Sequence, residues 1–177
     1  VINGPKISGF QKLVVFFCFA IIAIDGFDVV VMGLAAPQIM QEWGVSAKEL
    51  GPVLSAALFG LSIGALVAGP LADKFGRKAV LVASVLFFGV FTVITAFSQD
   101  ITHLVIYRFL TGLGLGAAAP NAATLSAEYA PERRRAFFVT LAYCGFSLGA
   151  AAGGFVAAWM IPAFGWQSML VVAGVVP

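Results

Sequence analysis

Long apolar runs, broken by short polar segments, divide the chain into six parts. The runs cover about residues 13–36, 51–72, 79–97, 102–127, 136–161 and 166–177. An apolar run of about 20 residues crosses the hydrocarbon core of a bilayer as one helix. The pattern therefore predicts an all-α membrane protein of six helices, the last one truncated, with no room for a soluble domain. Pro37 and Pro162 are predicted to end the first and fifth helices, and residues 38–50 are predicted to form a short exposed loop.

The composition agrees with a protein whose surface contacts lipid. Hydrophobic residues make up 61% of the chain and charged residues 10%, which excludes an ordinary soluble domain. The chain begins at Val1 and ends at Pro177 inside an apolar run, so we expect it to be a segment of a longer protein. Cys18 and Cys144 are far apart and lack the spacing of metal ligands. No metal, cofactor or nucleic-acid partner is expected.

The basic residues indicate how the helices cross the membrane. The segment before the first run and the turns after the second and fourth runs hold eight Lys and Arg residues, whereas the turns after the first and third hold only Lys48. Because basic loops stay on the cytoplasmic side, the amino terminus is predicted to be cytoplasmic. Trp159 and Trp166 then lie near the outer membrane boundary, where we expect them to act as interfacial anchors.

Three charged residues interrupt the apolar runs. Asp25 and Asp28 lie near the middle of the first run, and Arg108 lies about 9 Å into the fourth. A charge at the bilayer centre costs on the order of 3 kcal/mol on insertion scales, so such residues usually mark a path for ions, protons or substrate. The spacing of three places both carboxylates on nearly one helix face. We therefore expect these residues to take part in transport.

A short internal repeat sharpens the predicted architecture. Residues 60–69 of the second run align without gaps to residues 145–154 of the fifth, with an offset of 85. Three runs separate the copies, so the second copy enters the membrane in the opposite direction. An inverted repeat of this kind is common in secondary transporters. The repeated glycines have a four-residue spacing, which favours close helix packing over a phosphate-binding loop.

Two motifs resemble signatures of the major facilitator superfamily. Residues 69–78, GPLADKFGRK, resemble its loop between the second and third helices, and residues 108–116, RFLTGLGLG, resemble its fourth-helix signature. Residues 128–135, EYAPERRR, resemble part of a cytoplasmic charge cluster that steadies the outward-facing state. A plain basic turn would explain the cations of residues 69–78 but not the glycines or the aspartate. The candidate gating residues are Gly69, Asp73, Gly76, Arg77, Lys78, Glu128 and Arg135.

Together with the DGFD sequence at residues 25–28, these motifs resemble the aromatic acid:H+ symporter family of that superfamily. The resemblance implies the amino-terminal half of a twelve-helix transporter, built as a 3+3 inverted repeat, in the bacterial inner membrane. It also implies uptake of H+ with a small aromatic carboxylate, of the 4-hydroxybenzoate or protocatechuate type, by alternating access between two halves. Asp25, Asp28 and Arg108 are the candidates for proton coupling. Arg108, Asn121 and Tyr143 are the candidates for substrate binding.

Other functions stay open at this point. The loop signatures are shared widely, so a transporter for another solute, such as a sugar acid, another organic anion or an exported drug, is the main alternative. Val29 follows the second aspartate of the DGFD sequence, at a position where members of the aromatic acid:H+ symporter family often carry a hydroxyl residue. A channel would give fast flux without proton coupling. An integral membrane enzyme is not expected, because the chain lacks a convergent set of nucleophile, base or metal ligands.

Overall fold

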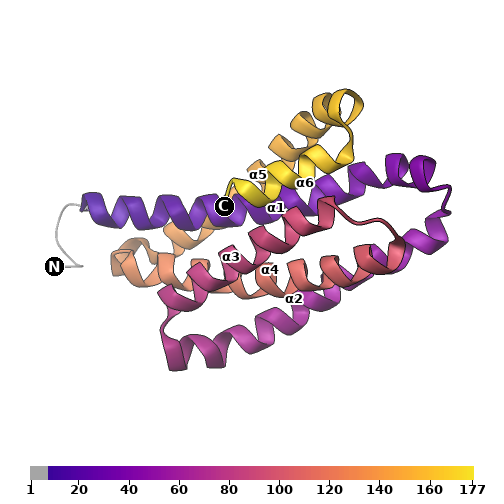
Figure 1. The fold of residues 1–177 in the computed structure, drawn as a ribbon. Helices are drawn as coiled ribbons and strands as arrows, with labels where there is room; N and C mark the ends of the chain where they lie inside the picture. Colours follow the sequence, from indigo (N-terminus) through magenta and orange to yellow (C-terminus); the bar gives the residue numbers. More distant parts are fainter. Residues whose placement is uncertain (1–7) are drawn as a thin grey trace.

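The computed structural model describes residues 8–177, which form a bundle of helices (Figure 1); Lys6, one of the basic residues counted above, lies outside this part. The described elements are α1 (Gly9–Trp43), α2 (Ala47–Phe75), α3 (Arg77–Ala96), α4 (Ile101–Tyr129), the short 3-10 helix η1 (Glu132–Arg134), α5 (Arg135–Phe164) and α6 (Trp166–Val175). Five of the described helices are long and apolar enough to cross a membrane, and α6 is a shorter apolar helix. The predicted all-α membrane architecture is confirmed.

The helix boundaries near two prolines were predicted wrongly. α1 continues through Pro37 to Trp43, and residues 38–43 are helical rather than part of a loop. A proline removes one backbone donor from a helix, but its φ is compatible with helix, and long membrane helices tolerate it. α1 ends instead at Gly44, which has a φ of 65° and donates its N–H to the carbonyl of Met40. α5 likewise passes through Pro162 and ends at Phe164.

Single glycines join two pairs of helices. Gly76 connects α2 directly to α3 with a φ of 86°, and Gly165 connects α5 directly to α6 with a φ of 80°. A positive φ is easily adopted only by glycine. Both connections follow a phenylalanine, Phe75 and Phe164, so the two copies of the repeat end in the same backbone geometry.

Close glycine contacts pair the helices in the manner of an inverted repeat. A Cβ on Gly60 or Gly64 of α2 would overlap the backbone of α4, and a Cβ on Gly145 or Gly149 of α5 would overlap the backbone of α1. The contact of α2 with α4 therefore corresponds to that of α5 with α1. This confirms the 3+3 inverted repeat and the packing role of the repeated glycines.

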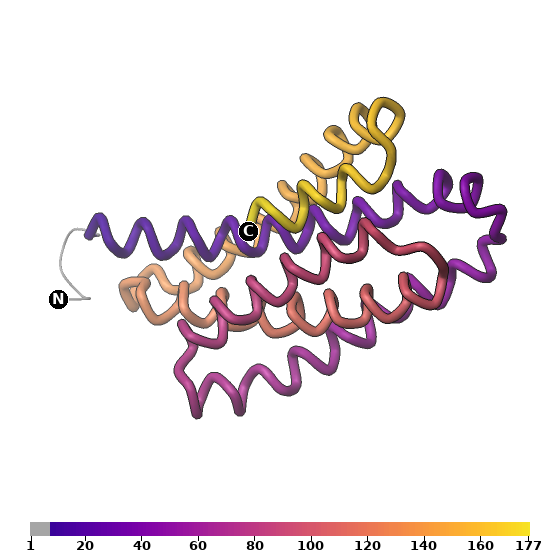
Figure 2. The backbone as a smooth tube through the Cα atoms, in the orientation of Figure 1, coloured from indigo at the N-terminus to yellow at the C-terminus, as the bar shows by residue number. Residues whose placement is uncertain are grey.

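The connections of the helices divide the bundle into two ends. The start of α1, the α2–α3 connection and the α4–α5 connection lie at one end, which we call the basic end, while the other three connections lie toward the opposite side (Figure 2). The basic end carries every described Lys and Arg except Lys48 and Arg108. The loops that the sequence predicts to lie on one side of the membrane, because of their basic residues, therefore do lie at one end of the bundle.

Trp166 does not lie at a lipid interface, contrary to the expectation above. Its side chain is fully buried, its indole N–H donates to Oε2 of Glu42 at 2.9 Å, and its ring packs edge-on against Trp43. Because Gly165 joins α5 directly to α6, Trp166 is the first residue of α6 and is packed against α1. Trp159, by contrast, is 69% exposed.

Candidate functional site

Arg108 of α4 and Asp28 of α1 form a buried ion pair. The two terminal nitrogens of the guanidinium donate to the two carboxylate oxygens, with Nη1–Oδ1 at 3.0 Å and Nη2–Oδ2 at 2.8 Å. Their side chains are 3% and 0% exposed. A bidentate pair of this kind is strong and directional, and removing one partner would leave the other charge buried without compensation. The structure thus brings together two of the three charges predicted to act in the membrane.

Asp25 lies one helical turn before Asp28 and is also buried, at 8% exposure. Its Oδ1 atom is buried and has no hydrogen-bond partner among the described residues, and the same holds for Nε of Arg108. Gly26, between the two aspartates, lies against the backbone carbonyl of Phe146 on α5. The close approach of α5 at this level of α1 therefore depends on the missing side chain of Gly26, which directly follows Asp25.

These charges lie between two apolar clusters. On α1 one cluster includes Cys18 and Ile22, and the other begins at Val31. Asp25 and Asp28 occupy the interval between them. The apolar clusters exclude solvent on both sides, which strengthens electrostatic interactions in the interval.

Two buried threonines belong to the same region but were missed by the sequence reasoning. Thr111 lies one turn from Arg108 on α4. Helices α3 and α4 run antiparallel, and Phe88 of α3 lies against Gly114 of α4. Thr92, one turn after Phe88, therefore lies at a level similar to that of Thr111. The hydroxyl of Thr111 donates to the carbonyl of Tyr107, whereas that of Thr92 has no partner among the described residues. Hydroxyl residues are common in apolar spans, so the sequence does not distinguish these two threonines from the others, and only the helix packing does. We call the set Asp25, Asp28, Thr92, Arg108 and Thr111 the buried polar layer.

The three candidate substrate-binding residues do not form one site. Asn121 is thirteen residues beyond Arg108 on the same helix, a separation of about 20 Å. Asn121 instead lines a cavity of about 290 Å³ between α2 and α4, together with Asp73 and Arg77. Tyr143 is 50% exposed on α5. A single small aromatic acid is too short to contact both Arg108 and Asn121.

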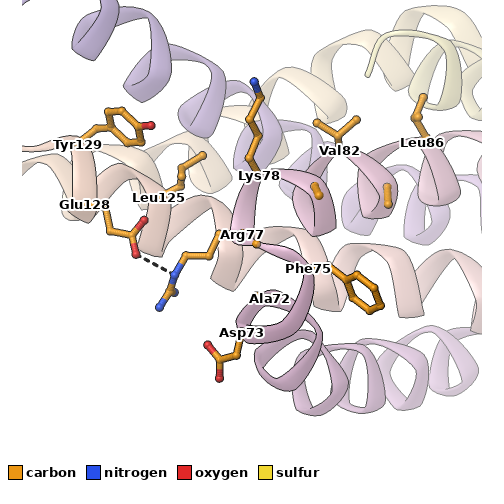
Figure 3. A pocket seen from close by; sticks show the side chains of 13 residues that line it. Ala72, Asp73, Phe75, Arg77, Lys78, Val82, Leu86, Leu125, Glu128 and Tyr129 are labelled. Atoms are coloured by element: carbon orange, nitrogen blue, oxygen red, sulfur yellow. Dashed lines mark ion pairs between the residues drawn. The ribbon is translucent and has the colours of Figure 1, made fainter.

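An ion pair at the basic end joins two of the candidate gating residues. Arg77, the first residue of α3, lies 2.8 Å through its Nε from Oε1 of Glu128 near the end of α4 (Figure 3). The two side chains are 36% and 47% exposed. They line an open pocket of about 920 Å³ that also includes Asp73 and Lys78. An exposed pair of this kind contributes little stability.

The remaining candidate gating residues are placed differently. Arg135 does not pair with Glu128; its Nε–H donates to the carbonyl of Ala127 at 3.2 Å. Asp73 is exposed and makes no ion pair within residues 8–177. Gly69 has open space where a side chain would be. Gly76 is needed for the turn between α2 and α3 because of its positive φ.

Comparisons with known proteins agree with this arrangement. The profile of the Major Facilitator Superfamily matches residues 17–177. The chain is 54% identical over 99% of its length to the 4-hydroxybenzoate transporter PcaK of Pseudomonas putida, and 47% identical over 99% of its length to the gallate transporter of the same species. It spans 39% of the length of each of these relatives.

A solved structure shows the same fold. The inward-open conformation of the xylose transporter XylE from E. coli matches with a TM-score of 0.80 and 21% sequence identity, over 93% of this chain and 45% of that chain. The profile covers most of this chain, and the matched proteins are transporters rather than enzymes. The chain therefore belongs to the major facilitator superfamily.

Proposed function

We propose that the protein containing this chain takes up small aromatic carboxylates together with protons, by alternating access between this half and a carboxy-terminal half. The observation that carries the proposal is the bidentate pair of Arg108 and Asp28, buried between two apolar clusters with Asp25 one turn away. Buried charges of this kind in a membrane span are characteristic of proton and substrate pathways.

The substrate class is supported by the relatives and by the chemistry of the site. The matched relatives are named for 4-hydroxybenzoate and gallate, both aromatic acids. Arg108 is the only cation that the structure describes within the middle of a span, and its Nε–H is free to donate. A guanidinium is well suited to bind a carboxylate. We assign Arg108 to the anion and leave Asn121 and Tyr143 as candidate contacts along the path rather than in the same site.

The basic end is proposed to face the cytoplasm of a bacterial cell, with the protein in the inner membrane. Seven described basic residues at this end, against Lys48 on the other side, support this orientation. The pair of Arg77 and Glu128 then joins α3 to α4 at the cytoplasmic surface. We propose that it belongs to a gate that must rearrange when the transporter opens inward, with Asp73 and Lys78 beside it.

Transport in proteoliposomes tests the proposal. The full-length protein would be reconstituted, and uptake of labelled 4-hydroxybenzoate would be measured with and without an inwardly directed proton gradient. Accumulation above equilibrium is expected only with the gradient, and protocatechuate and gallate are expected to compete. Competition by sugar acids but by no aromatic acid would overturn the substrate class. Downhill flux that a proton gradient does not change would overturn the coupling.

A further inference from the structure

The buried polar layer contains an uneven set of charges. It has two carboxylates, those of Asp25 and Asp28, and one guanidinium, that of Arg108. Both oxygens of Asp28 accept from Arg108, whereas Oδ1 of Asp25 is buried and has no hydrogen-bond partner in the described part of the chain. One guanidinium in this geometry neutralises one carboxylate. A second ionised carboxylate in the same dry region would be uncompensated, which is costly.

Within residues 8–177, the helices around Asp25 supply no cation in the middle of their spans other than Arg108. From α5, the backbone of Phe146 packs against Gly26, and Gly149 packs against Ala23. From α6, Val172 and Ala173 line a small apolar cavity of about 200 Å³ next to this part of α1. None of these contacts is titratable. Within the described residues, the other charged members of the buried polar layer are therefore Asp28, one turn along the same helix, and Arg108 of α4, which pairs with Asp28.

We propose that the two aspartates have different roles in the transport cycle, an inference that rests on the proposed function. Asp25 carries the coupled proton, and Asp28 stays ionised as the counter-ion that holds Arg108 in place. A proton from the outer side binds a carboxylate oxygen of Asp25 and makes the layer electrically neutral. The same proton leaves Asp25 toward the cytoplasm after the anion is released, and no other bond forms or breaks.

The asymmetry follows from position rather than residue type. Asp28 lies opposite Arg108, so its negative charge is compensated by two hydrogen bonds to a cation. Asp25 is displaced by three residues along α1, and within the described residues the guanidinium that binds both oxygens of Asp28 makes no hydrogen bond to Oδ1 of Asp25. Protonating Asp25 removes an uncompensated charge, whereas protonating Asp28 would break a bidentate pair and leave Arg108 unpaired.

The first test separates coupling from exchange. Full-length wild type, Asp25→Asn and Asp28→Asn would be reconstituted and assayed for proton-driven accumulation of 4-hydroxybenzoate and for exchange of labelled against unlabelled 4-hydroxybenzoate without a gradient. Asp25→Asn, which imitates the protonated group, is expected to lose accumulation above equilibrium while exchange falls less than tenfold. Asp28→Asn is expected to lose at least tenfold in both assays. Retained proton-driven accumulation in Asp25→Asn would overturn the inference.

The second test does not depend on transport rates. Infrared spectra of the full-length protein in lipid, recorded while the pH is changed, would show the C=O stretch of a protonated carboxyl group. This band is expected in wild type and in Asp28→Asn, and is expected to be absent in Asp25→Asn. Its loss in Asp28→Asn alone would reverse the assignment. If wild type itself shows no proton-driven accumulation of any aromatic acid, the proposed function fails, whereas the infrared assignment still decides which aspartate binds the proton.

Discussion

Gly89 of α3 and Gly174 of α6 face each other, each lying against the carbonyl oxygen of the other. A Cβ built on Gly89 would lie 2.8 Å from the Gly174 oxygen, and one built on Gly174 would lie 2.6 Å from the Gly89 oxygen. Such reciprocal contacts are typical of an interface related by a two-fold axis. The two glycines are 85 residues apart, the same offset as between residues 60–69 and 145–154. The pseudo-symmetry of the repeat therefore extends to the contact between α3 and α6.

The glycine contacts predict a sharp difference between neighbouring positions of α5. Gly149→Ala should destabilise the protein by about 1–3 kcal/mol, because its Cβ would overlap the backbone of Ala23, which cannot move aside as a side chain could. The thermal unfolding midpoint of the full-length protein in detergent would measure the loss. Gly154→Ala is the matched control, since a Cβ there meets open space. Equal midpoints for both variants would contradict the packing role.

Removing the guanidinium of Arg108 should destabilise the bundle because the carboxylate of Asp28 would then be buried without a partner. Arg108→Gln is expected to cost about 3–5 kcal/mol in unfolding free energy. The double variant Arg108→Gln with Asp28→Asn is expected to recover much of that stability but not transport. Thermal unfolding and uptake of 4-hydroxybenzoate, measured on the same preparations, would check both statements. A double variant as unstable as the single one would show that the ion pair is not the source of the loss.

Replacing Trp166 tests its position in the protein interior. Trp166→Ala should cost about 3–5 kcal/mol, because a fully buried aromatic side chain and its hydrogen bond to Glu42 are both lost. Trp166→Phe should cost less, since the ring packing against Trp43 is partly kept. Trp159→Ala, at an exposed position of α5, should change the unfolding midpoint little. If the Trp159 variant were the less stable of the two alanine variants, the assignment of Trp166 to the core would be wrong.

The exposed pair of Arg77 and Glu128 should affect cycling more than stability. Glu128→Gln is expected to lower the unfolding free energy by no more than about 1 kcal/mol. Under the proposed gating role it should shift the transporter toward the inward-open state, measured as faster labelling of a cysteine introduced on the inner path. Glu132→Gln is the control, because Glu132 is an exposed residue of the neighbouring η1. The charge-reversed pair Arg77→Glu with Glu128→Arg should restore wild-type labelling, and its failure to do so would count against a direct role of the pair.

Asp73 provides a separate test of the gate. Asp73→Asn is expected to slow transport turnover more than it weakens substrate binding, because Asp73 lies in the pocket at the basic end and far from Arg108. Uptake rates and equilibrium binding of 4-hydroxybenzoate to the full-length protein would distinguish the two effects. A large loss of affinity with unchanged turnover would place Asp73 in the substrate site instead.

The membrane class, the number of helices, the distribution of basic loops and the repeat could all be predicted from the amino-acid sequence. These properties depend on local composition, because about 20 apolar residues suffice for a span and the glycine spacing repeats along the chain. The sequence did not predict the ends of α1 and α5, since Pro37 and Pro162 resemble helix stops until the capping geometry of Gly44 and Gly165 is known.

Which charged side chains pair with each other could not be predicted from the sequence and became clear from the packing of the helices. Asp25 and Asp28 are alike in sequence context, yet one faces Arg108 eighty residues away and the other does not. Similarly, Glu128 pairs with Arg77 rather than with Arg135, and Asn121 lies with Asp73 rather than with Arg108. Contacts between residues distant in sequence depend on how each helix is rotated and how far it is shifted along its axis. Glycine contacts between helices set this rotation and shift. The hydrophobic pattern along a single helix does not specify them.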